Sequence, residues 1–209
     1  MFLRIFSGGV DPLIGVFWIV GLLFAITVHE FMHAWTANYF GDPTAKYMGR
    51  VTLNPIAHLD PIGTLAILFL PIGWGKPVPV NEANFRNRRK ASAIVSLAGP
   101  LSNLFVAFVF SIFLRFGLIT NEYVQALFLV IIIINIFLLV FNLIPIPPLD
   151  GSKILYYFLP RNINIQQLEA YGPFILLMLL FLTGGVFISL ISSAASFILS
   201  ILGVSGSLF

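Results

Sequence analysis

Apolar residues fill most of this chain in long runs, and short polar segments separate them. The charge-free runs cover residues 12–28, 63–75, 93–114, 123–149 and 170–209. About 20 such residues are needed for a helix to cross the hydrocarbon core of a bilayer. The pattern therefore predicts an all-α polytopic membrane protein, a helix bundle of about four to five spans.

Two of these runs do not fit a simple span. The run at 63–75 is too short to cross and is interrupted by Pro71, Gly73 and Gly75, so we expect a re-entrant membrane hairpin there. The last run, 170–209, contains two adjacent glycines and is long enough for one long helix or a hairpin of two. The sequence leaves these two possibilities open.

Composition supports a membrane protein. Of the 209 residues 59% are hydrophobic and 9% are charged, whereas soluble domains are roughly half apolar and a quarter charged. The chain has no cysteine, which excludes disulfide bonds and thiolate metal sites. We expect a single membrane-embedded domain over 1–209, with a catalytic core at about 12–155 and a C-terminal helical segment at 170–209.

The basic residues indicate how the spans are oriented. Four of them crowd into residues 86–90, and such loops are usually cytoplasmic. A nucleic-acid site is disfavoured there, because Phe85 is the loop's one aromatic residue. Alternation then places the ends of the first and third spans at the cytoplasmic face, in agreement with Lys46 and Arg50 after the first span.

The segment VHEFMHA, residues 28–34, places three polar side chains where lipid is expected. His29 and His33 are four residues apart and share one face of a helix, where two imidazoles can bind one Zn²⁺. Glu30 is then placed to act on a water beside the metal. Ionisable groups inside a membrane are costly and usually functional. We therefore expect one zinc ion per chain at this HExxH motif, rather than two histidines hydrogen-bonded within a bundle.

A zinc hydrolase needs a third protein ligand. The candidates are Asp150, in PIPPLDGS, and His58 or Asp60, in NPIAHLDP. Asp150 follows a span that ends on the same side as His33, and the prolines before it interrupt the helix, so that its carboxylate can turn inward. We therefore predict Asp150 as the third ligand and His58 as a group that supports the site or contacts substrate.

At this point the sequence resembles a known family, the site-2 proteases, which are intramembrane zinc metalloproteases. Five segments carry the resemblance in the expected order over residues 20–155: HEFMH at 29–33, LNPIAHLDPIGT at 53–64, GWGKPVPVN at 73–81, AGPLSN at 98–103 and NLIPIPPLDG at 142–151. The resemblance implies His29, His33 and Asp150 as zinc ligands and Glu30 as catalytic base. It also implies Asn103 and Asn142 as polar groups near the active site, although either could instead form an interhelical hydrogen bond.

The resemblance is to the compact branch of the family. No polar insertion is long enough for a PDZ domain, and no C-terminal regulatory module is evident. The helix that precedes the catalytic helix in many relatives is also expected to be absent. We therefore expect a membrane partner or a second copy of the chain to cover one flank of the site.

The predicted function is hydrolysis of peptide bonds within or near transmembrane segments of single-span membrane proteins, in regulated proteolysis or in clearance. The expected location is a prokaryotic cell membrane, with the site near the cytoplasmic side and no nucleic-acid partner. Segment 76–80 alternates proline and valine, and we expect it to act as an extended edge that pairs with an unwound substrate. Two alternatives are a membrane metal or ion transporter, disfavoured because no second copy of the motif exists, and a non-catalytic binding homologue, disfavoured because Glu30 is present.

Overall fold

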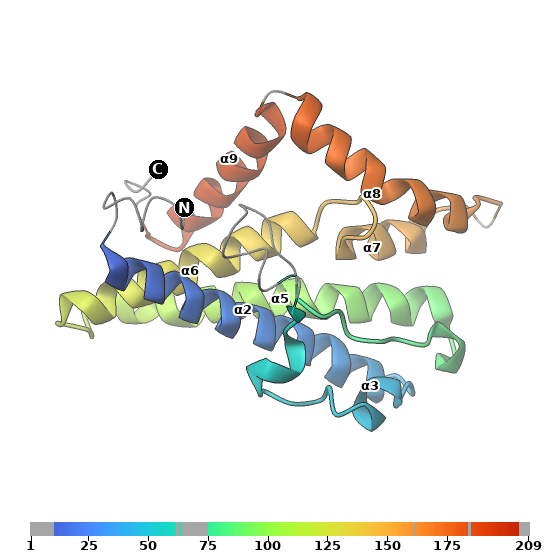
Figure 1. Ribbon diagram of the computed structural model, residues 1–209, viewed down its shortest axis with the longest axis horizontal. Helices are drawn as coiled ribbons and strands as arrows, with labels where there is room; N and C mark the ends of the chain where they lie inside the picture. The colour runs from blue at the N-terminus through green and yellow to red at the C-terminus, as the bar shows by residue number, and fades with distance from the viewer. Residues whose placement is uncertain (1–10, 62, 64–74, 161, 184, 205–209) are drawn as a thin grey trace.

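The structure is a computed structural model that describes residues 11–61, 63, 75–160, 162–183 and 185–204. In this part of the chain the fold is all-α (Figure 1). The α-helices are α2 (Pro12–Tyr39), α3 (Thr44–Tyr47), α5 (Arg88–Arg115), α6 (Glu122–Asn142), α7 (Asp150–Phe158), α8 (Ile165–Leu182) and α9 (Val186–Ile201). Two 3₁₀ turns lie at Pro55–His58 and Glu82–Asn84.

Four described helices are long and apolar enough to cross a membrane, namely α2, α5, α6 and α8. This confirms the prediction of an all-α polytopic membrane protein of about four to five spans. Helix α9 is apolar but shorter. Nearly all of the predicted re-entrant run at 63–75 lies outside the described residues, so the hairpin stays a prediction.

Polar side chains fix where the spans begin. Asp11 precedes α2 and accepts from the Leu13 N–H at 2.8 Å. Asn87 accepts from the Lys90 N–H at the start of α5, and Asn121 accepts from the Tyr123 and Val124 N–H groups at the start of α6. These contacts satisfy donors that the first helical turn leaves unpaired. Each helix therefore begins several residues before the apolar run that predicted it, or at its edge.

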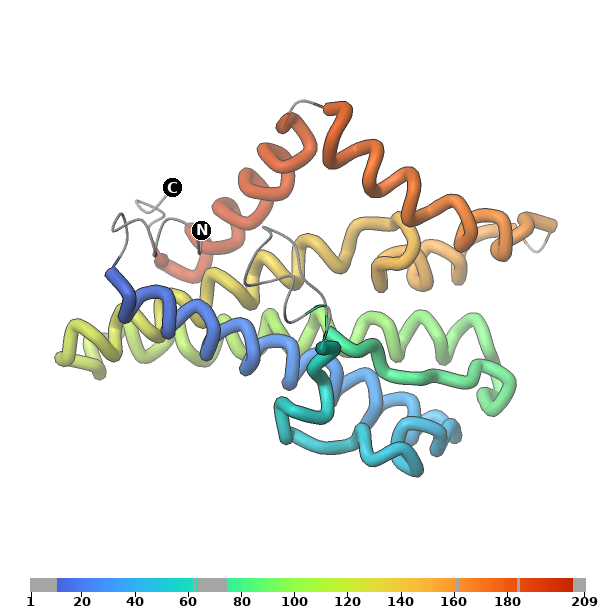
Figure 2. Tube along the Cα trace, viewed as in Figure 1, coloured from blue at the N-terminus to red at the C-terminus, as the bar shows by residue number. Residues whose placement is uncertain are grey.

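Helices α2, α5 and α6 run side by side and form the centre of the molecule (Figure 2). Helices α2 and α6 run in the same direction and α5 runs in the opposite one, as the alternation of spans predicted (Figure 1). Alanines buried on α2 allow close helix approach, as is usual between membrane helices. One apolar cluster joins α5, α6 and α9 through Ala107, Ile132, Ile136, Ala195 and Leu199.

The C-terminal run forms a hairpin of two helices, which resolves the alternative that the sequence left open. Helix α8 ends at Leu182 and α9 begins at Val186, with Gly185 between them at a φ of 90°. This left-handed conformation is readily adopted only by glycine. Helix α9 thereby returns to pack against α6 (Figure 1).

Asp42 stabilises the polar segment between α2 and α5 through hydrogen bonds, and its side chain is fully buried. Its carboxylate accepts from Thr44, from the Asn81 N–H at 2.7 Å and from the Asn84 side chain at 2.7 Å. Burial alone would raise the pKa of Asp42, but these hydrogen bonds outweigh it and lower the pKa. The extended segment 76–81 is thus held against the end of α2.

Candidate functional site

Helix α2 carries the three polar side chains of the HExxH motif on one helical turn. His29 and His33 are 6% and 8% exposed, and their Nε2 atoms lie 2.9 Å apart. The i, i+4 spacing brings both rings to the same face of the helix. Helix α5 packs against this face, which shields the rings from the surroundings.

Asp150 completes a group of three. It is the first residue of α7, and its Oδ2 atom lies 3.2 Å from His29 Nε2 and 3.3 Å from His33 Nε2. The chain reaches this point because α6 ends at Asn142 and a turn over 143–149 brings α7 back against α5. Gly151, the second residue of α7, allows this turn to pack closely, since a Cβ there would collide with the Leu143 carbonyl.

The donor set fits a metal ion. His29 Nδ1 lies 2.6 Å from Asn103 Oδ1, and His33 Nδ1 lies 2.8 Å from the Val95 carbonyl. Both oxygens can only accept, so each Nδ1 carries the proton and each Nε2 presents a lone pair. Two nitrogen lone pairs and a carboxylate oxygen converge on one point, an arrangement that is repulsive without a cation. Atoms about 2.0–2.1 Å from a tetrahedral zinc lie roughly 3.3 Å apart, close to the separations seen here.

Glu30 lies beside this group and is held by the main chain. Its Oε2 atom accepts from the Val78 N–H at 2.9 Å. Val78 belongs to the extended segment 76–80, where the Lys76 N–H donates to the His58 carbonyl at 2.9 Å and the Lys76 carbonyl accepts from Arg50. This hydrogen bond fixes the position of Oε2 and does not engage Oε1.

The sequence now places this geometry in a family. It matches Peptidase family M50 over residues 17–120 and 117–183, two ranges that contain the HExxH motif and Asp150 respectively. The chain belongs to peptidase family M50. This confirms the resemblance to the site-2 proteases.

Three relatives illustrate the M50 assignment. A Bacillus subtilis protein named "Putative zinc metalloprotease YwhC" is 42% identical over 175 residues, covering 79% of this chain and 80% of that protein. "Putative zinc metalloprotease Rip2" of Mycolicibacterium smegmatis is 36% identical over 77% of this chain and 63% of its own length. The Mycobacterium tuberculosis protein of that name is 33% identical over 74% and 60%. No solved structure gives a significant match.

The remaining predicted site residues of this M50 chain occupy three different settings. Asn103 is fully buried and contacts His29 directly. His58 is also fully buried, and its Nε2 lies 2.8 Å from the Thr52 carbonyl. This contact stabilises the turn whose His58 carbonyl accepts from the Lys76 N–H. Asn142 donates to the Leu138 carbonyl of its own helix at 3.0 Å. A role for His58 or Asn142 toward substrate stays a prediction.

Several residues that shape the M50 site were not singled out by the sequence. Arg50 was used only to indicate the cytoplasmic side, and the structure shows that it is 4% exposed and contacts segment 76–80. Burial lowers the pKa of Arg50, and the charge of the nearby Glu30 opposes that shift. Asn135, in the middle of α6, contacts Asn103. The signal for Asn135 was a single amide inside the apolar run IIIINIFLL.

Helix α7 is held in place by ion pairs that do not involve His29, His33 or Asp150. Lys153 Nζ lies 3.1 Å from Glu82 and 2.8 Å from Glu169. Burial would lower the pKa of Lys153, but the two carboxylates outweigh burial and raise it. In addition, Arg89 donates to the Leu159 carbonyl at the end of α7. These contacts fix the helix that begins with Asp150.

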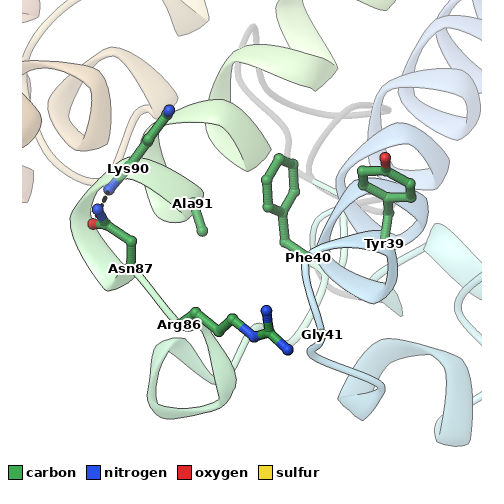
Figure 3. A pocket seen from close by; sticks show the side chains of 7 residues that line it. All are labelled: Tyr39, Phe40, Gly41, Arg86, Asn87, Lys90 and Ala91. Carbon is green, nitrogen blue, oxygen red and sulfur yellow. Dashed lines mark hydrogen bonds between the residues drawn. The ribbon is translucent and has the colours of Figure 1, made fainter.

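A separate hollow of about 450 Å³ lies between the end of α2 and the start of α5 (Figure 3). Its lining residues are Tyr39, Phe40, Gly41, Arg86, Asn87, Lys90 and Ala91. None of the predicted metal or catalytic residues is among them. The hollow therefore belongs to the basic end of the bundle and not to the M50 active site.

Gly99, in the AGPLSN segment, allows α5 to approach the two histidines. A Cβ at this position would lie 2.6 Å from His33 Cε1 and 2.7 Å from His29 Cε1. We therefore expect Gly99→Ala to displace the rings and to lower zinc affinity by about a hundredfold, beyond most changes around metal ligands. Zinc competition with a chelator measures this. Gly21→Ala is the matched control, because its Cβ would meet only apolar side chains, the nearest being the end of Ile134 at 3.0 Å. Equal zinc affinity in both variants would contradict the packing argument.

Proposed function

We propose that this chain is an intramembrane zinc metalloprotease that cleaves single-span membrane proteins within or near their transmembrane segments. The observation that supports this most strongly is the convergence of two imidazole lone pairs and a carboxylate, with Glu30 on the same helical turn. His29, His33 and Asp150 would hold the zinc. Family membership supports the proteolytic activity, and the apolar spans support an activity within the membrane.

Glu30 is assigned the proton transfers. Zinc, when bound, supplies the Lewis acidity that amide hydrolysis requires. Glu30 takes a proton from the attacking water and passes it to the leaving amine. The Val78 N–H holds Oε2 of the carboxylate, so Oε1 is the oxygen assigned to the proton. A main-chain donor positions the base without competing for metal.

Substrate recognition requires an unwound backbone, because the carbonyls of a membrane helix are already hydrogen-bonded. Segment 76–80 is proposed as the edge with which the unwound substrate pairs. It is extended, and Lys76 ties it to the 50–58 region on one side. Pro77 and Pro79 have no N–H, and the N–H groups of Lys76 and Val78 are already bonded to the His58 carbonyl and to Glu30. The Val80 N–H is therefore the main-chain donor of this segment that is proposed to pair with substrate.

A proline at Val80 tests this docking edge. Val80→Pro removes one main-chain donor while keeping the Val78 contact to Glu30, and we expect cleavage to fall by tenfold or more with zinc content unchanged. Val80→Thr keeps the donor and is expected to retain most activity. Val78→Pro is less informative, because it also removes the donor to Glu30. The measurement is the rate at which the parent and both Val80 variants cleave one model substrate. Equal rates in Val80→Pro and the parent would overturn the docking role.

The site is proposed to open toward the cytoplasmic side of a prokaryotic cell membrane. The residues of segment 86–90 lie at the end of the bundle where α2 finishes. Clusters of this kind favour the cytoplasmic face. The biological role is proposed to be regulated intramembrane proteolysis or clearance of membrane proteins, and a membrane partner or a second copy is proposed to cover the exposed flank of the site.

Reconstitution tests the proposed function. Purified protein in proteoliposomes is expected to cleave a single-span substrate, to stop after treatment with a chelator, and to recover when zinc is restored. A zinc-loaded protein that moves metal across the bilayer but leaves several single-span substrates intact would instead support the transporter alternative. Binding without cleavage or metal transport would support the non-catalytic alternative.

A further inference from the structure

Asn135 is a buried amide in the most apolar helix of the bundle. It is fully buried, and its neighbours Ile132, Ile134 and Ile136 are buried apolar residues. An amide in such surroundings is costly unless its hydrogen bonds are satisfied, and polar groups inside membrane helices are often functional. The position therefore requires an explanation that packing alone does not supply.

The contacts of Asn135 form a chain that ends at the metal centre. Its Nδ2 donates to the Ile131 carbonyl at 2.8 Å, and its Oδ1 accepts from Asn103 Nδ2 at 2.8 Å. Asn103 Nδ2 also reaches the Ala25 carbonyl at 3.2 Å, and Asn103 Oδ1 lies 2.6 Å from His29 Nδ1. The chain thus crosses from α6 through α5 to α2, the three helices that run side by side in Figure 2.

The direction of each hydrogen bond in this chain follows from its first member. A main-chain carbonyl can only accept, so the Ile131 carbonyl requires the amino group of Asn135 and turns its oxygen toward Asn103. That oxygen in turn requires the amino group of Asn103, which leaves the Asn103 oxygen for His29. An amide oxygen can only accept, so His29 Nδ1 carries the hydrogen and Nε2 keeps its lone pair.

We propose that Asn135 is a positioning residue that acts through Asn103 to fix the tautomer and ring orientation of His29. These hydrogen bonds orient His29 so that its Nε2 faces the point where the His33 and Asp150 atoms also converge. Hydrogen bonds to the second nitrogen of a ligand histidine are known to tune metal binding in this way. The inference rests on the proposed zinc site, but it concerns a residue that touches neither metal nor substrate.

Zinc affinity measured by chelator competition tests the linkage. We expect Asn103→Leu to weaken binding roughly 10–100-fold and Asn135→Leu to weaken it about tenfold, the range for groups behind metal ligands. If Asn135 acts through Asn103, the double variant binds zinc as weakly as Asn103→Leu alone. Unchanged affinity in Asn135→Leu, or independent losses that multiply in the double variant, would overturn the proposal.

Ser111→Ala is the matched control. Ser111 is a buried polar residue on α5, and its hydroxyl donates to the Phe108 carbonyl of its own helix at 2.7 Å. Ser111→Ala removes a buried hydrogen bond that is not connected to Asn135, Asn103 or His29. Zinc affinity should therefore stay within about twofold of the parent, since only groups linked by hydrogen bonds to the ligand side chains are expected to tune metal binding. If Ser111→Ala weakened zinc binding as much as Asn135→Leu, the Asn135 effect would be explained by general destabilisation of the fold, and the proposal would be overturned.

A second measurement reads the tautomer of His29 directly. The chain has three histidines, so ¹⁵N labelling of histidine gives few signals to assign. In metal-free protein, His29 should be protonated at Nδ1, and Asn135→Leu should introduce the other tautomer. Protonation of His29 at Nε2 in the parent would contradict the inference. A parent protein that binds no zinc would instead refute the proposed function, so the two failures are distinct.

Discussion

Glu30→Gln is expected to reduce proteolysis by about 10²–10⁴-fold, the usual contribution of a general acid–base group. Glutamine keeps an oxygen that can accept from the Val78 N–H, so the local structure should persist. It cannot take a proton from water. Because Glu30 is assigned as the base and not as a ligand, zinc content should remain that of the parent. Rates with a single-span substrate and elemental analysis of the same preparations measure both quantities.

Glu122→Gln provides the matched control for this change. Glu122 is exposed in the first turn of α6, several helical turns before Asn135, the residue of this helix that contacts Asn103. The same loss of one carboxylate charge there should leave cleavage and zinc content unchanged. Substantial activity in Glu30→Gln would exclude Glu30 as the base, whereas simultaneous loss of zinc would indicate that it is a ligand.

Asp150→Ala should have the largest effect on metal binding. It removes one of three converging ligand atoms, and the two histidines alone would leave zinc with an incomplete protein shell. Zinc affinity should therefore fall by more than the roughly 100-fold upper range seen for changes behind the ligands. Proteolysis should be lost with the metal. Elemental analysis after dialysis against a weak chelator measures the loss.

His58→Ala distinguishes the alternative third ligand. His58 pairs with the Thr52 carbonyl, and its own carbonyl receives the Lys76 N–H. We expect His58→Ala to keep zinc and to disturb the position of segment 76–80. Loss of zinc in His58→Ala together with retained zinc in Asp150→Ala would show that the third ligand was wrongly chosen.

The grouping of His29, His33 and Asp150 was predictable because each of these residues is marked by a local pattern. The i, i+4 spacing of His29 and His33 follows from helix geometry, and the prolines before Asp150 mark the point where the chain can turn back. Orientation by charge then brought the ends of the two spans together. The helical class followed from the apolar runs in the same way, whereas the capping residues that set where the spans begin were seen only in the structure.

The surroundings of the centre were less predictable, for physical reasons that differ among residues. The Val78 contact to Glu30 uses a main-chain N–H, which carries no mark of residue type. Arg50 has the charge of a surface loop residue, and only tertiary packing shows that it is buried. Asn135 acts across 32 residues of sequence, on a helix whose apolar pattern gives little sign of which face meets Asn103. Such contacts depend on helix rotation, which the apolar run of α6 does not specify.

X-ray absorption spectroscopy at the zinc edge tests the central claim most directly. The account predicts about one zinc per chain, bound by two imidazole nitrogens and one carboxylate oxygen at about 2.0–2.2 Å, with room for a water. The three histidines of the chain make the imidazole count decisive. Two imidazoles in the parent, and still two with a lost oxygen in Asp150→Ala after zinc is added in excess, would support the site. No bound zinc, or a third imidazole contributed by His58, would contradict it.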